Sequence, residues 1–137
     1  MASGCVFCAI IAGDVPAPMV MRDDDVAAFL DARPLFKGHV LVVPRAHTPT
    51  LYDVPPAALG TLFAGVQRIA RAVEAGLGVD GTFVAMNNKV SQSVPHLHVH
   101  VVPRKRKDGL RGFFWPREPY ADDAEREAFA AKIRAAL

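Results

Sequence analysis

Residues 96–102, His-Leu-His-Val-His-Val-Val, alternate histidine with aliphatic side chains. This two-residue alternation predicts a β-strand. Residues two apart in a strand point to the same side, so His96, His98 and His100 should share one face at spacings of about 6.6–6.8 Å. Leu97 and Val99 should then face a core, and the chain must build a sheet with one imidazole-bearing surface.

Three further segments are rich in apolar and β-branched residues and are separated by turn residues. They predict additional strands, and the connections between several of them have hairpin length. The four predicted strands are Val26–Leu30, Val40–Val43, Thr82–Met86 and Leu97–Val102.

A long helix is predicted from about Pro55 to Ala75, with Asp53 as its N-cap and Gly76 as its C-terminal stop. Its apolar residues recur at helical spacing and form one stripe. A second helix is predicted from about Asp122 to the end, with Phe129, Ile133 and Leu137 on one face. Together these elements predict an α+β fold: an antiparallel sheet with a long packed helix and a C-terminal helix.

The composition is that of an ordinary globular protein. The 137 residues are 51% hydrophobic and carry a net charge of +2, which predicts a single domain over residues 1–137 and argues against a nucleic-acid partner. No stretch approaches the roughly 18–20 apolar residues of a membrane span, so no membrane association is expected. Two cysteines are too few for a secreted disulfide scaffold, and a cytoplasmic location is the expectation.

Three histidines on one strand face suit two chemistries. Neutral imidazoles bind transition metals, or one imidazole attacks an electrophile while its neighbours orient it and handle protons. The residues just before the strand favour the second, because they are neutral donors suited to phosphate oxygens and no Asp or Glu lies near the triad in the sequence. These donors are Asn87, Asn88, Gln92 and Ser93.

The segment from Gln92 to Arg104 resembles the signature of the histidine triad (HIT) family. The resemblance extends to Gly38–Pro44, to Phe29-Leu30-Asp31 and to the opening Cys5–Ile11. It implies a HIT-type fold in a protein class of nucleotide hydrolases and transferases that are usually homodimers.

The resemblance also implies roles for the histidines. His98 would attack the α-phosphorus of a purine nucleotide to form a nucleotidyl-histidine intermediate, which water would then hydrolyse. His100 would contact the phosphoryl and leaving-group oxygens, and His39 and His96 would support the triad.

The same carry-over implies substrate contacts. Ser93 and Asn87 would donate to phosphate oxygens, and Gln92 matches a motif position. Asp31 would accept hydrogen bonds from the ribose hydroxyls; from its position before Pro34 alone, a turn residue is an equal alternative. An apolar slot for the purine base would be formed by Val6, Phe7, Ile10 and Phe29, which composition alone would place in the core.

A histidine at position 100, where the transferase branch carries glutamine, favours a hydrolase. The N-terminal block is more similar to the Hint branch of purine nucleoside phosphoramidases than to the Fhit branch of diadenosine polyphosphate hydrolases. A diadenosine polyphosphate hydrolase or phosphorylase, or a nucleotide-binding interaction protein, remains the alternative. The loop before Gln92 is shorter than in relatives, and Lys89 within it is either solvated or a cation near the leaving group.

Cys5-x-x-Cys8 on its own suits half a zinc site, a redox pair or two unrelated thiols. Bacterial Hint-like proteins carry this pair with a histidine after the Gly-His strand. The resemblance therefore implies one structural zinc per chain, held by Cys5, Cys8, His47 and His96. Such a site would tether an N-terminal arm of about residues 1–18.

The C-terminal extension, about residues 104–137, begins with the basic run Arg104–Lys107. No aromatic residue interleaves this run, so a solvated loop is expected rather than a nucleic-acid site. The aromatic cluster Phe113–Trp115 suits packing, a cover for the site or a contact with a partner subunit.

Overall fold

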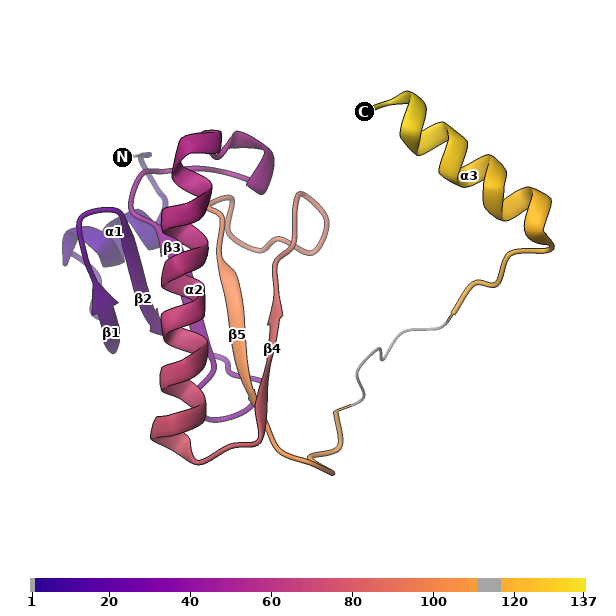
Figure 1. Cartoon of the computed structure of the whole chain (residues 1–137). Coiled ribbons are helices and arrows are strands. Elements are labelled where there is room, and N and C mark those ends of the chain that lie inside the picture. The colour runs from indigo at the N-terminus through magenta and orange to yellow at the C-terminus, as the bar shows by residue number, and fades with distance from the viewer. Residues whose placement is uncertain (1, 111–116) are drawn as a thin grey trace.

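The computed structural model describes residues 2–110 and 117–137. Its centre is a five-stranded antiparallel sheet in the order β1-β2-β3-β5-β4 (Figure 1). The strands are β1 (Met19–Arg22), β2 (Val26–Leu30), β3 (Val40–Pro44), β4 (Gly81–Ala85) and β5 (Val99–Arg104). The helices are α1 (Val6–Ala12), α2 (Pro56–Leu77) and α3 (Asp123–Ala135), with a 3-10 turn, η1, at Leu51–Asp53.

Helices cover the two faces of the sheet, and each face has its own apolar core. The long helix α2 packs on one face, where Leu62, Val66 and Ile69 meet Val99 and Val101 of β5. The short helix α1 packs on the other face through Phe7, Ile10 and Ile11. Because both faces are covered, residues 26–29 and 40–43 are all buried and do not alternate with polar residues.

The register of β5 assigns the histidine face. Val99 and Val101 pair with Val42 and Val40 and face α2, while His100 pairs with Leu41, whose side chain belongs to the α1 core. The predicted division between an aliphatic and an imidazole face is therefore confirmed, and the imidazoles lie on the α1 side.

The triad strand begins later than predicted, at Val99 and not at Leu97, and it runs to Arg104. The physical reason is a competing backbone partner, because the peptide N–H of Leu97 donates to the carbonyl of Thr48 at 2.7 Å. His96 and His98 thus stand on an extended approach to β5, tied to the loop that carries His47.

The predicted helix caps are also corrected. The long helix runs over Pro56–Leu77, and Gly78 at φ 62° closes it, so Gly76 lies inside the last turn. The Asp53 carboxylate instead accepts from the N–H and hydroxyl of Thr50 and caps η1. Helix α1 and strand β1 are not predicted from the sequence, because both are too short for a clear period.

The approach to β3 requires glycine at position 38. Gly38 has φ 97°, and a Cβ there would lie 2.3 Å from Cδ1 of Leu77. We expect Gly38→Ala to lower the free energy of unfolding by about 1–2 kcal/mol, the cost of a left-handed residue with a side chain. Gly60→Ala in α2 is the matched control, since nothing lies within 4 Å of its Cβ position and helix propensity should raise stability by about 1 kcal/mol. Chemical denaturation measures both, and equal effects would contradict the expectation.

The C-terminal helix α3 forms as predicted, although it stands apart from the sheet (Figure 1). Asp122 caps it by accepting from the N–H of Glu125. None of its residues is buried, and Phe129 and Ile133 are 47% and 65% exposed. Among the described helices, none combines the length and apolar character needed to cross a membrane.

Candidate active site and metal cluster

A cavity of about 530 Å³ opens on the α1 side of the sheet and gathers residues from four parts of the chain. Most of the sequence-predicted substrate contacts line it: the four base-slot residues and Asp31, Ser93, His98 and His100. The base-slot residues are Val6, Phe7, Ile10 and Phe29. Phe7 packs edge-on against both Phe29 and His98, with ring centroids at 5.3 and 5.1 Å.

His98 is buried in this wall, and one hydrogen bond fixes its ring. Its Nδ1 lies 2.8 Å from the carbonyl oxygen of His96. A carbonyl can only accept, so the neutral ring carries its proton on Nδ1 and leaves a lone pair on Nε2. An unprotonated nitrogen on a ring of fixed orientation is what a nucleophilic histidine requires.

His100 and His39 form a second imidazole pair beside His98. His39 Nε2 lies 2.9 Å from His100 Nδ1 and 3.7 Å from the Asp31 carboxylate. Burial, with smaller contributions from His98 and His39, lowers the pKa of His100 to about 4. Burial also lowers the pKa of His39, and Asp31 opposes the shift. Both rings are therefore neutral near pH 7. The sequence did not predict that the Asp31 carboxylate lies beside this imidazole pair, because Asp31 is far from the triad along the chain.

The lowered pKa of His100 predicts acid sensitivity. Between pH 6.5 and about 4 the unfolded chain binds a proton at this histidine and the folded chain does not. The free energy of unfolding is therefore highest above pH 6.5 and falls as the pH drops from 6.5 to about 4, by about 3 kcal/mol for this group, with no further loss from it below that range. In chelator-treated protein, denaturation from pH 4 to 8 should show a shallower acid slope for His100→Gln than for wild type. Parallel curves would contradict the assignment.

The second cluster joins α1 to the approach to β5. Cys8 Sγ lies 3.4 Å from His47 Nδ1 and 3.6 Å from His96 Nδ1, and Cys5 Sγ lies 3.5 Å from His96 Nδ1. All four ligand atoms lie within 4.8 Å of one another. The cysteines meet because Cys5 caps α1, its Sγ accepting from the N–H of Cys8.

The donor set of this cluster fits zinc. Two sulfurs and two imidazole nitrogens are the ligands of closed structural zinc sites. His96 Nε2 donates to the carbonyl of Pro44 at 2.7 Å, which leaves its Nδ1 unprotonated toward the sulfurs. A hydrogen bond on the far nitrogen is typical of metal-ligating histidines. Burial raises the pKa of the Cys8 thiol, so a cation would be needed to hold it as a thiolate.

Two predicted phosphate contacts lie outside the cavity. The Asn87 amide donates to the carbonyl of Ser91 at 3.3 Å. Gln92 bridges two backbone segments, donating to the carbonyl of Pro49 at 2.6 Å and accepting from the N–H of Lys89 at 2.9 Å. The Lys89 ammonium lies 5.3 Å from the centre of the Tyr52 ring. The compact loop thus uses its polar groups to hold itself, with Lys89 and Ser91 at positive φ.

The basic run is partly paired. Arg104 forms an ion pair with Asp108 at 2.6 Å and donates to the carbonyl of Leu110, so it is not a free phosphate contact. The Phe113–Trp115 cluster lies outside the described residues.

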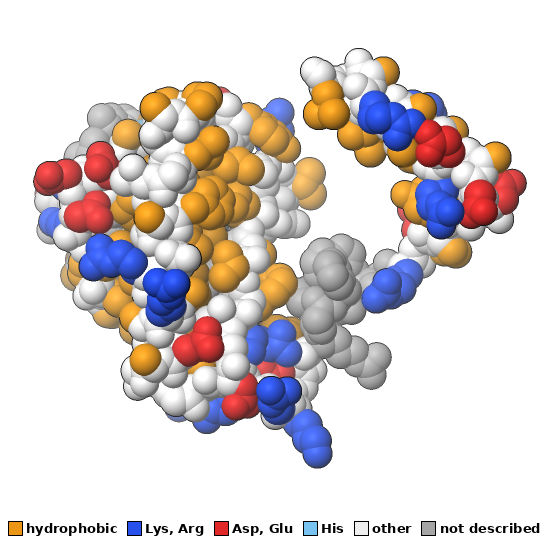
Figure 2. Space-filling model, viewed as in Figure 1, with side chains coloured by type: hydrophobic (Ala, Val, Ile, Leu, Met, Phe, Trp, Pro, Cys, Tyr) orange, Lys and Arg blue, Asp and Glu red, His pale blue; other side chains and the backbone are white. Residues whose placement is uncertain are grey.

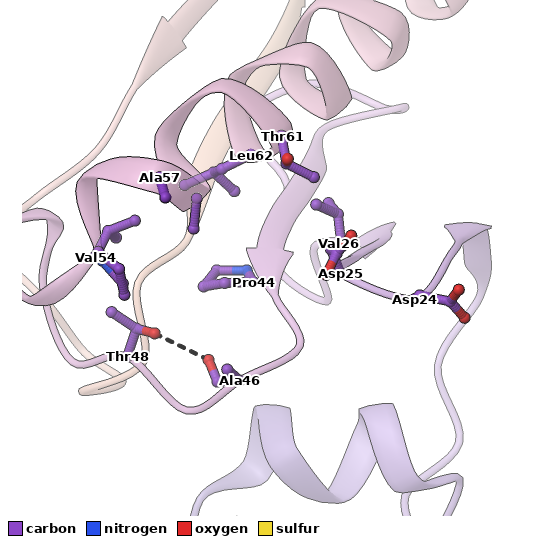
Figure 3. A pocket seen from close by; sticks show the side chains of 12 residues that line it. Asp24, Asp25, Val26, Pro44, Ala46, Thr48, Val54, Ala57, Thr61 and Leu62 are labelled. Carbon is purple, nitrogen blue, oxygen red and sulfur yellow. Dashed lines mark hydrogen bonds between the residues drawn. The ribbon is translucent and has the colours of Figure 1, made fainter.

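A separate cavity of about 380 Å³ lies between the start of α2 and the loop that follows β3 (Figure 3). Its walls are mainly apolar, including Val26, Pro44 and Leu62, and Asp24 and Asp25 lie at one side. The Thr48 hydroxyl donates to the carbonyl of Ala46 in this wall. Because none of the triad histidines lines it, this cavity does not belong to the imidazole site.

An imidazole pair at the start of β5, over an apolar cavity and on this sheet order, is the arrangement of a HIT-type protein. The HIT domain family matches residues 12–107, and this chain belongs to that family. An uncharacterized HIT-like protein of Mycobacterium tuberculosis, Rv1262c, is 44% identical over 138 residues, covering 97% of this chain and 92% of the relative. The crystal structure of SMU.412c from Streptococcus mutans superposes with a TM-score of 0.88 at 36% identity, covering 98% of this chain and 86% of that one.

Two further relatives bear on ligands. A zinc-bound histidine triad family protein from Mycobacterium smegmatis is 40% identical with a TM-score of 0.74, and 98% of each chain is covered. Adenosine 5′-monophosphoramidase hnt1 of Schizosaccharomyces pombe is 29% identical over 135 residues, covering 95% of this chain and 98% of the relative.

Proposed function

We propose that this HIT-family nucleotide hydrolase cleaves nucleoside 5′-phosphoramidates of purines, with His98 as the nucleophile. The observation that carries the proposal is the hydrogen bond from His98 Nδ1 to the carbonyl of His96, which leaves Nε2 free in the cavity wall. The similarity to the fission-yeast monophosphoramidase supports the substrate class.

In the proposed first step, His98 Nε2 forms a bond to the α-phosphorus as the phosphorus–nitrogen bond of the substrate breaks. The amine leaves with the electron pair and takes a proton from water. His100 contacts the phosphoryl oxygens, and the Ser93 hydroxyl donates where negative charge builds. His39 orients the His100 ring through its Nε2, and the carbonyl of His96 orients the His98 ring.

In the second step, water attacks the nucleotidyl-histidine. The nucleoside monophosphate departs, Nε2 recovers its electron pair and the proton of the water passes to solvent. Asp31 accepts from the ribose hydroxyls, and the slot around Phe7 and Phe29 holds the purine. Because the Asn87 and Gln92 amides are occupied by backbone partners, any phosphate contact from them requires the loop to rearrange.

The test is to trap the intermediate. Incubation with α-labelled adenosine phosphoramidate, followed by a rapid quench, should leave an acid-labile adenylyl group on His98. Turnover without an adduct in wild type and in a hydrolysis-impaired variant would refute covalent catalysis. Comparing kcat/KM for the phosphoramidate and for diadenosine tetraphosphate distinguishes the two hydrolase branches. Normal nucleotide binding and an intact cellular role in His98→Asn would instead favour the interaction-protein alternative.

We also propose one structural zinc per chain at Cys5, Cys8, His47 and His96. The thiol–imidazole distances, the Pro44 carbonyl behind His96 and the zinc-bound relative support it. Zinc would supply a cross-link between the N-terminal arm and the approach to β5. Cys5 and Cys8 belong to that arm, and His96 stands two residues before the nucleophile.

We propose a homodimer, with each chain forming one HIT domain in the cytoplasm. Within residues 2–110 and 117–137, β4 is the last strand of the sheet and pairs with β5, and apolar side chains gather over α2 and β4 (Figure 2). Phe63 of α2 and Val84 of β4 are 38% and 42% exposed. Light scattering should show that Val84→Asp shifts dimer to monomer. Val20→Asp on the opposite edge strand, where Val20 is 50% exposed, is the control that should stay dimeric.

A further inference from the structure

In a cavity proposed to bind a phosphate group, the role of each imidazole that lines it depends on which ring nitrogen carries the proton. The carbonyl of His96 settles this for His98. His100 is different, because its Nδ1 faces His39 Nε2 at 2.9 Å and either nitrogen could be the donor. An outside group must decide between the two arrangements.

That group is a peptide N–H in the loop before β3. The Leu35 N–H donates to Nδ1 of His39 at 3.1 Å. A peptide N–H can only donate, so Nδ1 of His39 is unprotonated and the single proton of the neutral ring sits on Nε2. Nε2–H then donates to Nδ1 of His100, and the proton of His100 is left on its Nε2.

We propose that Leu35 is a positioning residue whose peptide N–H fixes, through His39, the tautomer of His100. The result is a complementary pair of nitrogens on neighbouring rings, a lone pair on His98 Nε2 and an N–H on His100 Nε2. His98 and His100 both line the cavity, with ring centroids 5.1 Å apart. The opposite tautomer of His100 would present a second lone pair to an anionic phosphate. This use of the N–H rests on the proposed function.

The loop is built to hold this N–H in place. The Asp31 carboxylate accepts from the N–H of Arg33 at 2.8 Å, and the N–H of His39 donates to the carbonyl of Phe36 at 3.0 Å. The other Asp31 oxygen lies 3.7 Å from His39 Nε2, where it favours a proton on that nitrogen. The Leu35 side chain is 56% exposed, so the contribution of this residue comes from its backbone.

The exposed side chain allows a clean pair of variants. Leu35→Pro removes the N–H, and Leu35→Ala shortens the side chain to a similar extent and keeps it. Ring-nitrogen NMR on the free protein at neutral pH reads the tautomers directly. We expect Nε2–H forms of His39 and His100 in wild type and Leu35→Ala, and a mixture with Nδ1–H forms in Leu35→Pro. In single turnover, Leu35→Pro should transfer nucleotide to His98 about tenfold more slowly, as expected for one lost hydrogen bond. The nucleotide Kd should change less than about twofold.

A second replacement guards against a distorted loop. Incorporating the α-hydroxy analogue of leucine at position 35 replaces only N–H by O and should reproduce the tautomer shift of Leu35→Pro. An Nδ1–H form of His39 in wild type would overturn the proposal, as would unchanged tautomers in both the proline and ester proteins. Because tautomers are read without substrate, a failure to trap the His98 adduct would count against the proposed function alone.

Discussion

Replacing His98 by alanine is expected to lower kcat on an adenosine phosphoramidate by at least about 10³-fold, with nucleotide Kd within about threefold of wild type. The reason is that, in the described part of the chain, only this ring lines the cavity and also has its Nδ1–H bound by a backbone carbonyl, which leaves the lone pair on Nε2. The ring also packs on Phe7, so Tm should be measured to separate lost chemistry from lost packing.

The companion variant His98→Gly offers a sharper check. Its empty ring site should admit free imidazole, and added imidazole should restore part of the lost turnover through attack by the small molecule. Rescue without an adduct on the protein fits this mechanism. Retention of a tenth or more of the wild-type kcat in His98→Ala would contradict the assignment of the nucleophile.

Loss of the metal cluster is the second large effect expected. Wild-type protein should carry about one zinc per chain. Cys8→Ser should carry almost none, because the substitution removes one of the four ligands that a closed tetrahedral site needs. Binding that is specific to the folded state stabilises that state. We therefore expect Cys8→Ser to lose several kcal/mol and about 10 °C in Tm. Metal analysis and thermal unfolding, with and without chelator, measure this.

Asp31→Asn is the matched control, because Asp31, His39 and His100 form the other close group of potential ligands in the described part of the chain. It should keep its zinc while Cys8→Ser loses it. Zinc content unchanged by Cys8→Ser would refute the assignment. Chelation that abolished turnover but spared the fold and nucleotide binding would place metal in the chemistry and contradict attack by His98 without a metal.

Much of the fold could be predicted because its main signals are periodic. The alternation at 96–102 predicted the division of the sheet into two faces, and the helical stripe predicted α2 to within two residues at its C-terminal end. The two caps were misplaced for one reason. Asp53 and Gly76 are residue types suited to capping a helix, but nearby residues decide where capping occurs. Asp53 bonds to Thr50 instead of capping the long helix, and Gly78, not Gly76, closes that helix. Short elements such as α1 and β1 carry too few residues to show a period.

The sequence by itself determined which residues are present for chemistry: the triad, the Cys-x-x-Cys pair and an apolar opening segment. Only the tertiary structure decided which of them form the cysteine–histidine cluster and which line the cavity. His96 turns its Nδ1 to the sulfurs while its carbonyl holds His98, and Asp31 reaches His39. The tertiary structure also decided that the Gln92 amide bonds to the backbone of Pro49 and Lys89 and does not line the cavity. The physical reason is that the direction in which successive side chains point follows from local backbone geometry. Hydrogen-bond partners from distant segments meet only when the strands assemble into the sheet.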